Sequence, residues 1–300
     1  MEPAPIARPT LPGLLRFHLQ VSRPGLWFPT IWLYLLPLTA DGPGATDRLT
    51  SPAFWVGLAY VCWPLNHWVY GWNDRVDTHT DAVNPRKGTW LFGARGTPAE
   101  LATLPRAMTL VQLLCWPVLA WFGGWPVFLT GAAIALVLYL YNHPERGLRG
   151  RPPGDLIAQG GYLLTVVLAA QVNGVPLPGP LVFGYLALFC AQAQLVGEVM
   201  DIAPDRASGR RTTATVLGTR NTKWLIIAIV AGEVALVAGP LNDPPFAAAL
   251  GAFLVWLLVD QLVLFRQGPH SLRLMKVFGV LSNLCAVASM GWIWWRGGLG

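Results

Sequence analysis

The chain has 300 residues, of which 54% are hydrophobic and only 12% are charged, and its formal net charge is +6. A soluble globular domain usually carries about 25% charged residues, so this composition excludes an ordinary water-soluble domain. The 4 cysteines lie far apart within apolar runs, which argues against a disulfide framework or a cysteine metal site.

Apolar runs separated by polar loops follow one another along the whole chain, and most approach the ~20 residues with which a helix crosses a bilayer. The pattern predicts nine membrane-spanning helices, at residues 25–40, 53–72, 101–122, 125–141, 156–172, 180–200, 224–241, 246–265 and 274–295. We therefore expect an all-α, polytopic membrane protein, with a single domain over residues 1–300 arranged around a central cavity.

The basic residues predict the orientation, because Lys and Arg favour cytoplasmic loops. With the N-terminus inside, only Arg48 and Arg296 of the 21 basic residues fall on the outer side. This asymmetry predicts a cytoplasmic N-terminus, and it assigns the net charge to topology and anionic membrane lipids rather than to nucleic acid. The inner loops at 73–100, 142–155 and 201–223 are long and polar, so we expect function at the cytoplasmic face.

The sequence NDRVDTHTD (residues 73–81) ends the second predicted span, and the basic pair Arg86 and Lys87 follows it. A helix turns by about 100° per residue, so four polar residues of this string would share one helix face within about 100°. These four are Asn73, Asp74, Asp77 and Asp81. Asn66 and Tyr70 extend the same stripe toward the membrane interior.

An equivalent string ends the sixth predicted span. Its members, at the same offsets, are Glu198, Asp201, Asp205, Arg210 and Arg211. Gln194 lies on the same face one turn earlier, whereas Pro204 removes a backbone donor and is expected to bend or end the helix. The two strings predict two four-helix pseudo-repeats, about 24–141 and 155–265, followed by a ninth helix at 274–295.

Acidic side chains on two facing helix ends repel one another unless cations lie between them. Carboxylate and amide oxygens without Cys or His suit Mg²⁺, which keeps part of its shell for phosphate oxygens. The basic pairs Arg86/Lys87 and Arg210/Arg211 can bind the phosphate oxygens that the metal does not reach. The implied ligand is a diphosphate with a long hydrocarbon tail in the membrane, which describes a prenyl diphosphate.

NDRVDTHTD resembles the NDxxDxxxD motif of the UbiA superfamily of membrane prenyltransferases, and MDIAPDRASGRRTTATVLG (200–218) is similar to the second motif of that family. The resemblance covers essentially the whole chain. It implies that two Mg²⁺ ions assist the ionisation of an allylic prenyl diphosphate, whose prenyl group passes to a lipophilic acceptor. The metal-binding positions that it implies are Asn73, Asp74, Asp77, Asp81, Asp201 and Asp205, and the internal repeat adds Glu198.

The resemblance also implies substrate contacts outside the acidic strings, among them Arg206 of the second motif. The family often has a Tyr-x-x-x-Lys element in the loop after the fourth helix. Here that loop reads YLYNHPERGLRGRPPGD (139–155) and has no Lys. The candidates for this contact are Tyr139 and Tyr141, with Arg146 or Arg149 as the positive charge.

Glu233 is an acidic residue within the seventh predicted span, where an ionisable group indicates function by default. Two interpretations remain open: Glu233 deprotonates the acceptor or the final carbocation, or it hydrogen-bonds a neighbouring helix. The candidate catalytic residues are Asp77, Asp201, Arg210 and Glu233.

The sequence thus predicts an intramembrane prenyltransferase whose diphosphate site faces the cytoplasm. The DR-x-x-G-x-x-T form of the second motif looks most like the branch that acts on chlorophyllide, homogentisate and carotenoid acceptors, so we expect a bulky lipophilic acceptor. Two alternatives remain. A terpene cyclase would use the same site without a second substrate, and a cation-coupled transporter would leave the basic pairs unexplained.

Overall fold

The structure is a computed structural model of the chain, and it describes residues 10–41 and 46–299. Within these residues the chain is helical throughout: no strand occurs, and one isolated β-bridge joins Thr89 and Gly93. The predicted all-α class is therefore confirmed.

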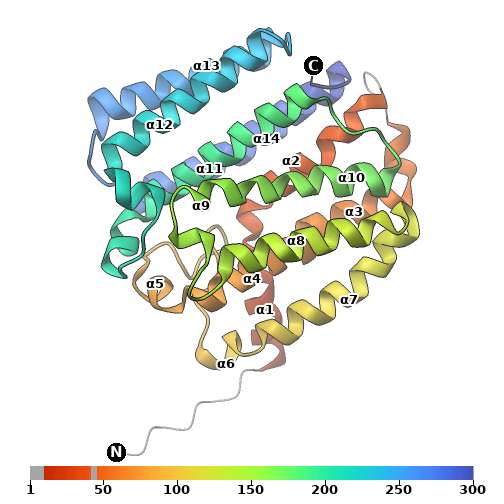
Figure 1. Cartoon of the computed structure of the whole chain (residues 1–300), viewed down its shortest axis with the longest axis horizontal. Coiled ribbons are helices and arrows are strands. Elements are labelled where there is room, and N and C mark those ends of the chain that lie inside the picture. The colour runs from red at the N-terminus through yellow and green to blue at the C-terminus, as the bar shows by residue number, and fades with distance from the viewer. Residues whose placement is uncertain (1–9, 42–45, 300) are drawn as a thin grey trace, which may run out of the picture.

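Long helices run roughly side by side across the molecule (Figure 1). The α-helices are α1 (Leu11–Val21), α2 (Phe28–Leu35), α3 (Pro52–Cys62), α4 (Pro64–Val76), α5 (Thr78–Val83), α6 (Pro98–Leu101), α7 (Leu104–Gly123), α8 (Pro126–Asn142), α9 (Gly154–Ile157), α10 (Leu164–Asn173), α11 (Pro180–Ala207), α12 (Thr213–Ala238), α13 (Pro244–Val259) and α14 (Leu272–Arg296). Short 3₁₀ turns are η1 (Pro24–Leu26), η2 (Leu36–Asp41), η3 (Asp47–Thr50), η4 (Leu148–Gly150) and η5 (Ala158–Leu163), and η6 (Asp260–Leu264) is a π-helix.

Six helical segments are long and apolar enough to cross a membrane: Pro98–Gly123, Gly154–Asn173, Pro180–Ala207, Thr213–Ala238, Pro244–Leu264 and Leu272–Arg296. Two further apolar helices, Phe28–Thr39 and Pro126–Asn142, are shorter. The predicted span 53–72 is divided between α3 and α4. The chain is a multi-pass membrane protein, while the count of nine spans and the two-half repeat stay predictions.

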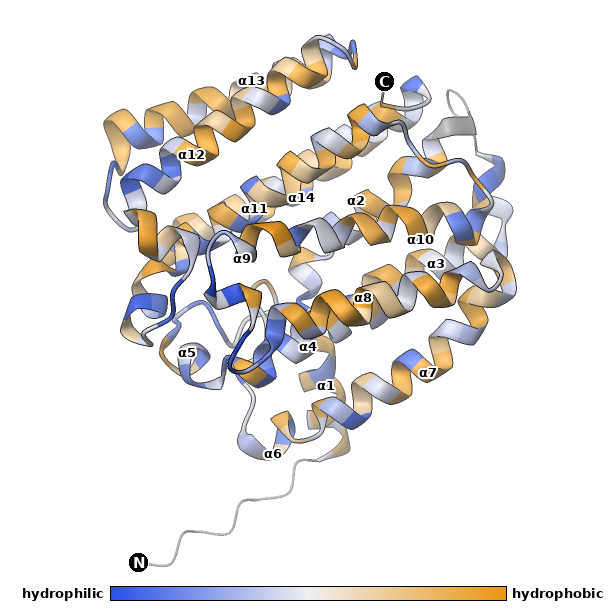
Figure 2. Ribbon diagram, viewed as in Figure 1, coloured by the Kyte–Doolittle hydropathy of each residue, from blue (hydrophilic) through white to orange (hydrophobic). Residues whose placement is uncertain are grey.

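The outer surface of the helices is apolar. Figure 2 shows hydrophobic residues along α8, α12 and α13, whereas hydrophilic residues gather around α5 and the loop between α8 and α9. Large apolar side chains face outward, with Trp121 86% and Leu114 72% exposed. Such a surface is stable in lipid rather than in water, and the polar end of the bundle marks where charged chemistry collects.

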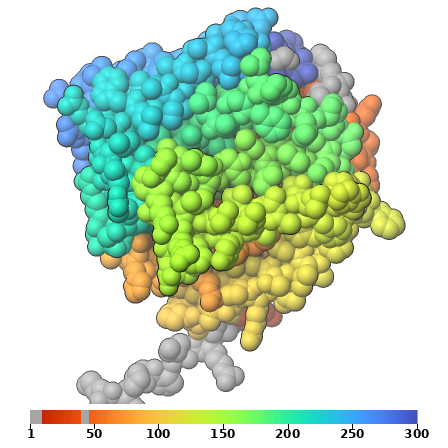
Figure 3. All heavy atoms as spheres, viewed as in Figure 1, coloured from red at the N-terminus to blue at the C-terminus, as the bar shows by residue number. Residues whose placement is uncertain are grey.

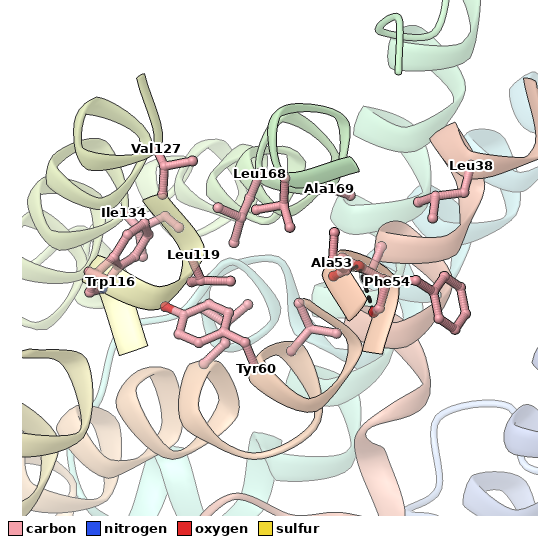
Figure 4. Close-up of a cluster of buried hydrophobic side chains, with 14 of the residues drawn as sticks. Leu38, Ala53, Phe54, Tyr60, Trp116, Leu119, Val127, Ile134, Leu168 and Ala169 are labelled. Carbon is pink, nitrogen blue, oxygen red and sulfur yellow. Dashed lines mark hydrogen bonds between the residues drawn. The ribbon is translucent and has the colours of Figure 1, made fainter. Parts of the chain in front are cut away.

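A cluster of buried side chains holds α3, α7, α8 and α10 together. In Figure 4, Trp116 and Ile134 lie together at one side of the cluster, and Leu119 lies between Tyr60 and Leu168. Tyr60 donates a hydrogen bond to Gln112 at 2.9 Å, so the hydroxyl of this buried ring keeps a partner. The core therefore fixes the helices whose far ends carry the polar loops.

Pro64 separates α3 from α4, because proline provides no backbone donor and clashes with the preceding turn. Asn66 repairs this break. Its side-chain amide donates to the Val61 carbonyl at 2.7 Å and to Thr30 Oγ1 at 2.8 Å. The structure thus places Asn66 in the support of α4, fully buried, rather than on an open polar stripe.

The common face predicted for each acidic string assumed that the string lies on one continuous helix, and this holds for only one of the two strings. Helix α4 ends at Val76, Asp77 has non-helical backbone angles, and α5 starts at Thr78. Helix α11, by contrast, continues through Pro204 to Ala207. The expectation that the helix could end at Pro204 was therefore wrong. Since α5 packs against α11, the two strings still meet.

Candidate active site

The ends of α4 and α11 are brought together by α5. Thr80 on α5 and Ser208, directly after α11, are hydrogen-bonded through their hydroxyls at 3.0 Å. The loop between α8 and α9 covers this end of the molecule and forms part of its surface (Figure 3). Carboxylates from both strings therefore lie in one polar region, together with the loops that follow α5, α8 and α11.

In the first string, each carboxylate lies against a basic side chain. Asp74 is 3% exposed and accepts from Arg23 at 3.0 Å and from the Lys87 ammonium. The same ammonium lies 2.8 Å from Asp81. Burial raises the pKa of Asp81 to about 6, although Lys87 acts in the opposite direction. Lys87 thus bridges two of the predicted metal-binding carboxylates.

In the second string, Asp201 forms a bidentate pair with Arg86: Nε donates at 2.8 Å, and Nη2 donates to the other carboxylate oxygen. The side-chain amide of Asn84 also donates to Asp201, at 2.9 Å. The loop after the first string thereby supplies the cation for the second string. Bidentate guanidinium–carboxylate pairs have the planar geometry that a guanidinium also uses for phosphate.

Asp77 connects the two strings. It is 5% exposed, accepts from Arg149 of the α8–α9 loop, and accepts from Arg210 Nη1 at 3.0 Å. Arg210 Nη1 also lies 3.8 Å from Asp205. The predicted catalytic residues Asp77 and Arg210 are therefore in direct contact, and Asp201 lies in the same region on α11.

Glu198 is used inside the fold. Its oxygens accept from Gln194 Nε2 at 2.9 Å and from the Ala214 amide at 3.0 Å, in the first turn of α12. Gln194 in turn lies 3.4 Å from the hydroxyl of Tyr141. Both carboxylate oxygens of Glu198 thus already accept hydrogen bonds, one from a side chain and one from the backbone. Glu198 supports the first turn of α12 and has no carboxylate oxygen left free for a metal.

Several predicted substrate contacts do not join the ion-pair network. Arg146, Arg206 and Arg211 are exposed, and within residues 10–41 and 46–299 they form no ion pair. Tyr139 is 49% exposed and packs edge-on against His143. Asn73 is half-buried beside Asp74. In the α8–α9 loop, Arg149 contacts a site carboxylate, whereas Arg146 does not.

Glu233 lies far from this region. It is 1% exposed on α12, and it is within electrostatic range of Tyr185 on α11. Tyr185 precedes Asp201 by ~24 Å along the helix axis at 1.5 Å per residue. The structure therefore does not bring Glu233 to the acidic strings. Both of its carboxylate oxygens are buried, and neither has a hydrogen-bond partner among the described residues, so its expected catalytic role stays a prediction.

Two site residues were not singled out from the sequence. Arg23 reaches Asp74 from the turn before α2, and its guanidinium lies 4.1 Å from the centre of the Tyr70 ring. Asp155 is fully buried and accepts from the backbone amide and the hydroxyl of Thr213, at 2.6 and 2.7 Å. The only sequence signals were a basic residue before a span and an acid in a loop, and both are too common to be specific.

The donor set fits Mg²⁺ only together with a phosphorylated ligand. No group of three or more acidic, His or Cys side chains in the described part of the chain converges closely enough to hold a metal ion by itself. The carboxylates stand apart, each against a cation, and Asp74 Oδ2 is a buried oxygen with no hydrogen-bond partner there. Mg²⁺ commonly binds through one or two carboxylates and completes its shell with phosphate oxygens and water.

These features define a class: a helical membrane protein with an acidic and arginine-rich site at one end of its bundle. The UbiA prenyltransferase family matches residues 26–284, so the chain belongs to that family and is a prenyltransferase. The resemblance seen in the two acidic motifs is thereby confirmed.

Relatives of known name agree with this assignment. The chain is 32% identical over 234 residues to the lycopene elongase/hydratase of Haloarcula japonica, covering 72% of this chain and 74% of that protein. It is 26% identical over 230 residues to the digeranylgeranylglyceryl phosphate synthase of Halobacterium salinarum, covering 72% of each.

The fold is similar to that of a UbiA homolog from Archaeoglobus fulgidus. The structure of that protein bound to GPP and Mg²⁺ superposes with a TM-score of 0.65 at 14% identity, covering 93% of this chain and 99% of that one. At this identity the similarity concerns the fold alone.

Proposed function

We propose that this protein transfers a prenyl group from an allylic prenyl diphosphate to a lipophilic acceptor within the membrane. The observation that supports this most directly is the pairing of the acidic strings with cations. Arg86, Lys87, Arg149 and Arg210 all lie against site carboxylates, and all can exchange these for diphosphate oxygens. A site with acids alone would suit a cation, and a site with arginines alone would suit a simple anion.

Asp74, Asp77, Asp81, Asp201 and Asp205 would hold two Mg²⁺ ions, with Asn73 as an amide ligand. Bound there, Mg²⁺ supplies Lewis-acid stabilisation of the negative charge on the departing diphosphate. The chain itself contributes guanidinium and ammonium groups at fixed positions, which stabilise the same charge without reorganisation.

The reaction breaks the bond between the prenyl C1 and the diphosphate oxygen, and the electron pair leaves with the oxygen. Arg149 and Arg210 lie where they can stabilise that oxygen, because both contact Asp77 at the centre of the site. The allylic cation then accepts an electron pair from a C=C bond of the acceptor, and a new carbon–carbon bond forms. The carbocation left on the acceptor loses a proton to water or to the released diphosphate, which gives a neutral prenylated product. Tyr70, which lies under the Arg23 guanidinium, offers an aromatic face at the rim of the site.

A small, mainly apolar pocket of about 60 Å³ lies beside the second string, and we take it as the point at which an apolar acceptor approaches the site. It is lined by Val196, Val199, Met200, Lys223, Ile226, Phe253, Trp256, Leu257, Asp260, His270, Leu274, Met275 and Phe278. Met200 directly precedes Asp201, and its sulfur lies 3.6 Å from Arg86. Met200 thus places one edge of this pocket next to the diphosphate region.

The names of the relatives suggest two acceptor classes. The higher identity is to the lycopene elongase/hydratase, so we favour a long polyene hydrocarbon over a phosphorylated glycerol ether. We also keep the predicted orientation, with the N-terminus and the diphosphate site on the cytoplasmic side, nine spans in two halves and one domain.

The test uses purified protein in lipid with dimethylallyl, geranyl and geranylgeranyl diphosphates and lycopene, with and without Mg²⁺. Released diphosphate and lipid products are measured together, the latter by mass spectrometry. We expect Mg²⁺-dependent release that requires the acceptor and yields a prenylated product. Asp77→Ala and Asp201→Ala should each abolish release, whereas Asp47→Ala, an exposed aspartate before α3, should leave it unchanged.

Other outcomes identify the alternatives. Release without acceptor, together with a cyclic hydrocarbon, would show a terpene cyclase. A prenylated product only with a small water-soluble acceptor such as 4-hydroxybenzoate would refute a lipophilic acceptor. No release with any diphosphate would remove the support for the diphosphate site, and cation transport would be measured next.

A further inference from the structure

A second pocket lies outside the acidic strings, where the first turns of α12 meet the end of α13. Its volume is about 180 Å³, which is ample for a phosphate group. It is lined by Arg220, Trp224, Gln261, Leu262, Arg266 and Gln267. None of these residues belongs to the diphosphate site, and none is acidic.

The two arginines of this pocket differ from those of the diphosphate site. Arg86, Arg149 and Arg210 each lie against a carboxylate. Arg220 and Arg266 form no ion pair with any residue in the described ranges. The pocket thus carries two positive charges that the protein leaves uncompensated.

The acid behind the pocket is already neutralised. Asp260 is 4% exposed, and its carboxylate lies 2.6 Å from Lys223 Nζ and 3.0 Å from His270 Nε2. This carboxylate therefore does not offset Arg220 or Arg266, and the field in the pocket favours an anion.

The backbone of Arg266 has a conformation that residues with a side chain rarely adopt. Arg266 has φ +49°, a left-handed conformation that is uncommon for a residue with a side chain. Its amide and that of Phe265 both donate to the Asp260 carbonyl, at 2.9 and 3.1 Å, closing the π-helix η6. Because Asp260 is anchored to Lys223 and His270, the turn that carries Arg266 is built on a buried ion-pair cluster. Strain of this kind persists where the surrounding structure imposes it, often at binding sites.

The remaining lining residues suit a lipid more than a soluble anion. Trp224 is 39% exposed, and tryptophan favours the interface between headgroups and acyl chains. Leu262 is 55% exposed on the apolar side of η6, where an acyl chain would lie. Basic pockets at the ends of membrane helices bind anionic lipid headgroups.

We propose that Arg220 and Arg266 form a binding site for the phosphate of an anionic phospholipid, with Trp224 and Leu262 against its glycerol and acyl chain. A zwitterionic lipid carries a positive headgroup that two uncompensated arginines repel, so the site selects lipids with net negative charge. The site does not depend on the proposed reaction, since it shares no residue with the diphosphate region.

The test is native mass spectrometry of the full chain in detergent, titrated with phosphatidylglycerol and with phosphatidylcholine of the same acyl chains. We expect one phosphatidylglycerol to remain bound under conditions that remove phosphatidylcholine. Arg220→Gln/Arg266→Gln should weaken phosphatidylglycerol binding about 30-fold, from the ordinary contribution of two arginines near a membrane surface. The control, Arg273→Gln/Lys276→Gln, removes the same charge from exposed positions near the start of α14 and should stay within about twofold of the unmodified protein.

Three results would overturn the proposal. Equal retention of the two lipids would show that the pocket does not select negative charge. Equal weakening by the control variant would show that only net charge matters. Displacement of the lipid by millimolar inorganic phosphate would identify a site for soluble phosphate instead. If the glutamine variant fails to fold, Arg220→Lys/Arg266→Lys keeps both charges and should lose only the geometry of the contact, and the comparison of the two lipids on the unmodified protein still decides.

Discussion

The structure predicts that Mg²⁺ and diphosphate stabilise this protein together and hardly at all separately. Mg²⁺ alone must displace Lys87, Arg86 and Arg149 from their carboxylates. Removing one partner of a buried ion pair costs about 3–5 kcal/mol, because the other charge stays buried without compensation. Diphosphate alone would bring several negative charges beside Asp77 and Asp201. When both bind, the cations pass to phosphate oxygens and the carboxylates pass to Mg²⁺.

The magnitude follows from linkage. A ligand at 100 times its Kd stabilises the folded state by about 2.7 kcal/mol. For a chain of this size, that corresponds to roughly 5–10 °C in the unfolding midpoint at about 2–4 °C per kcal/mol. We expect each component alone to shift the midpoint by less than about 1 °C.

The assay is thermal unfolding in detergent at one scan rate, followed by intrinsic fluorescence, for which the chain offers 15 Trp. Mg²⁺, inorganic diphosphate and both together are compared. Asp77→Asn should remove the joint shift, and Asp47→Asn, at the exposed η3 turn, should keep it. A full shift with Mg²⁺ alone would refute the reasoning, because it would mean that the carboxylates form a metal site without the ligand.

In steady-state assays, Arg149→Gln should raise KM for the prenyl diphosphate about tenfold or more, because it removes a charge-assisted contact. The control is Arg146→Gln, at an exposed position that has no ion pair in the described chain, and it should change KM by less than about twofold. Asp155→Asn should lower the free energy of unfolding by about 1.5–3 kcal/mol, because it weakens the two charge-assisted hydrogen bonds to Thr213; an unchanged denaturant midpoint would contradict this. Burial lowers the pKa of His18 below its usual 6.5, so as the pH falls the unfolded chain binds a proton at His18 before the folded chain does. The stability that His18 contributes above pH 6.5 is therefore lost as the pH falls below that value. His18→Gln should flatten this loss of stability in a series of melting curves at decreasing pH.

The spacing of the acidic strings was sufficient to predict that their carboxylates would gather in one region. Asp77 and Asp201 lie 124 residues apart at equivalent positions, and the fold brings their loops into one region. The sequence could not show that Arg86 would cross to Asp201 while Lys87 stays with Asp74. Two adjacent basic residues look alike in the sequence. Only the path of the loop after α5 decides which carboxylate each of them reaches.

Helix faces were the least reliable inference. The common face predicted for Asp74, Asp77 and Asp81 assumed one helix, but the chain breaks at Asp77 and restarts as α5. Basic side chains from the loops link these carboxylates instead. Glu233 shows the same limit. Its place within a span made it a catalytic candidate, but the fold puts it within electrostatic range of Tyr185 and away from the acidic end.

The sequence by itself determined the membrane class, the family and the acidic motifs, because these follow from the length of apolar runs and from residue types at fixed local spacing. Tertiary structure decided which cation each carboxylate holds, that Arg149 rather than Arg146 reaches Asp77, and that Asp155 and Glu198 anchor the start of α12. These contacts join residues from separate loops and helices. Their energies depend on distance and burial in three dimensions, for which one-dimensional spacing carries no information.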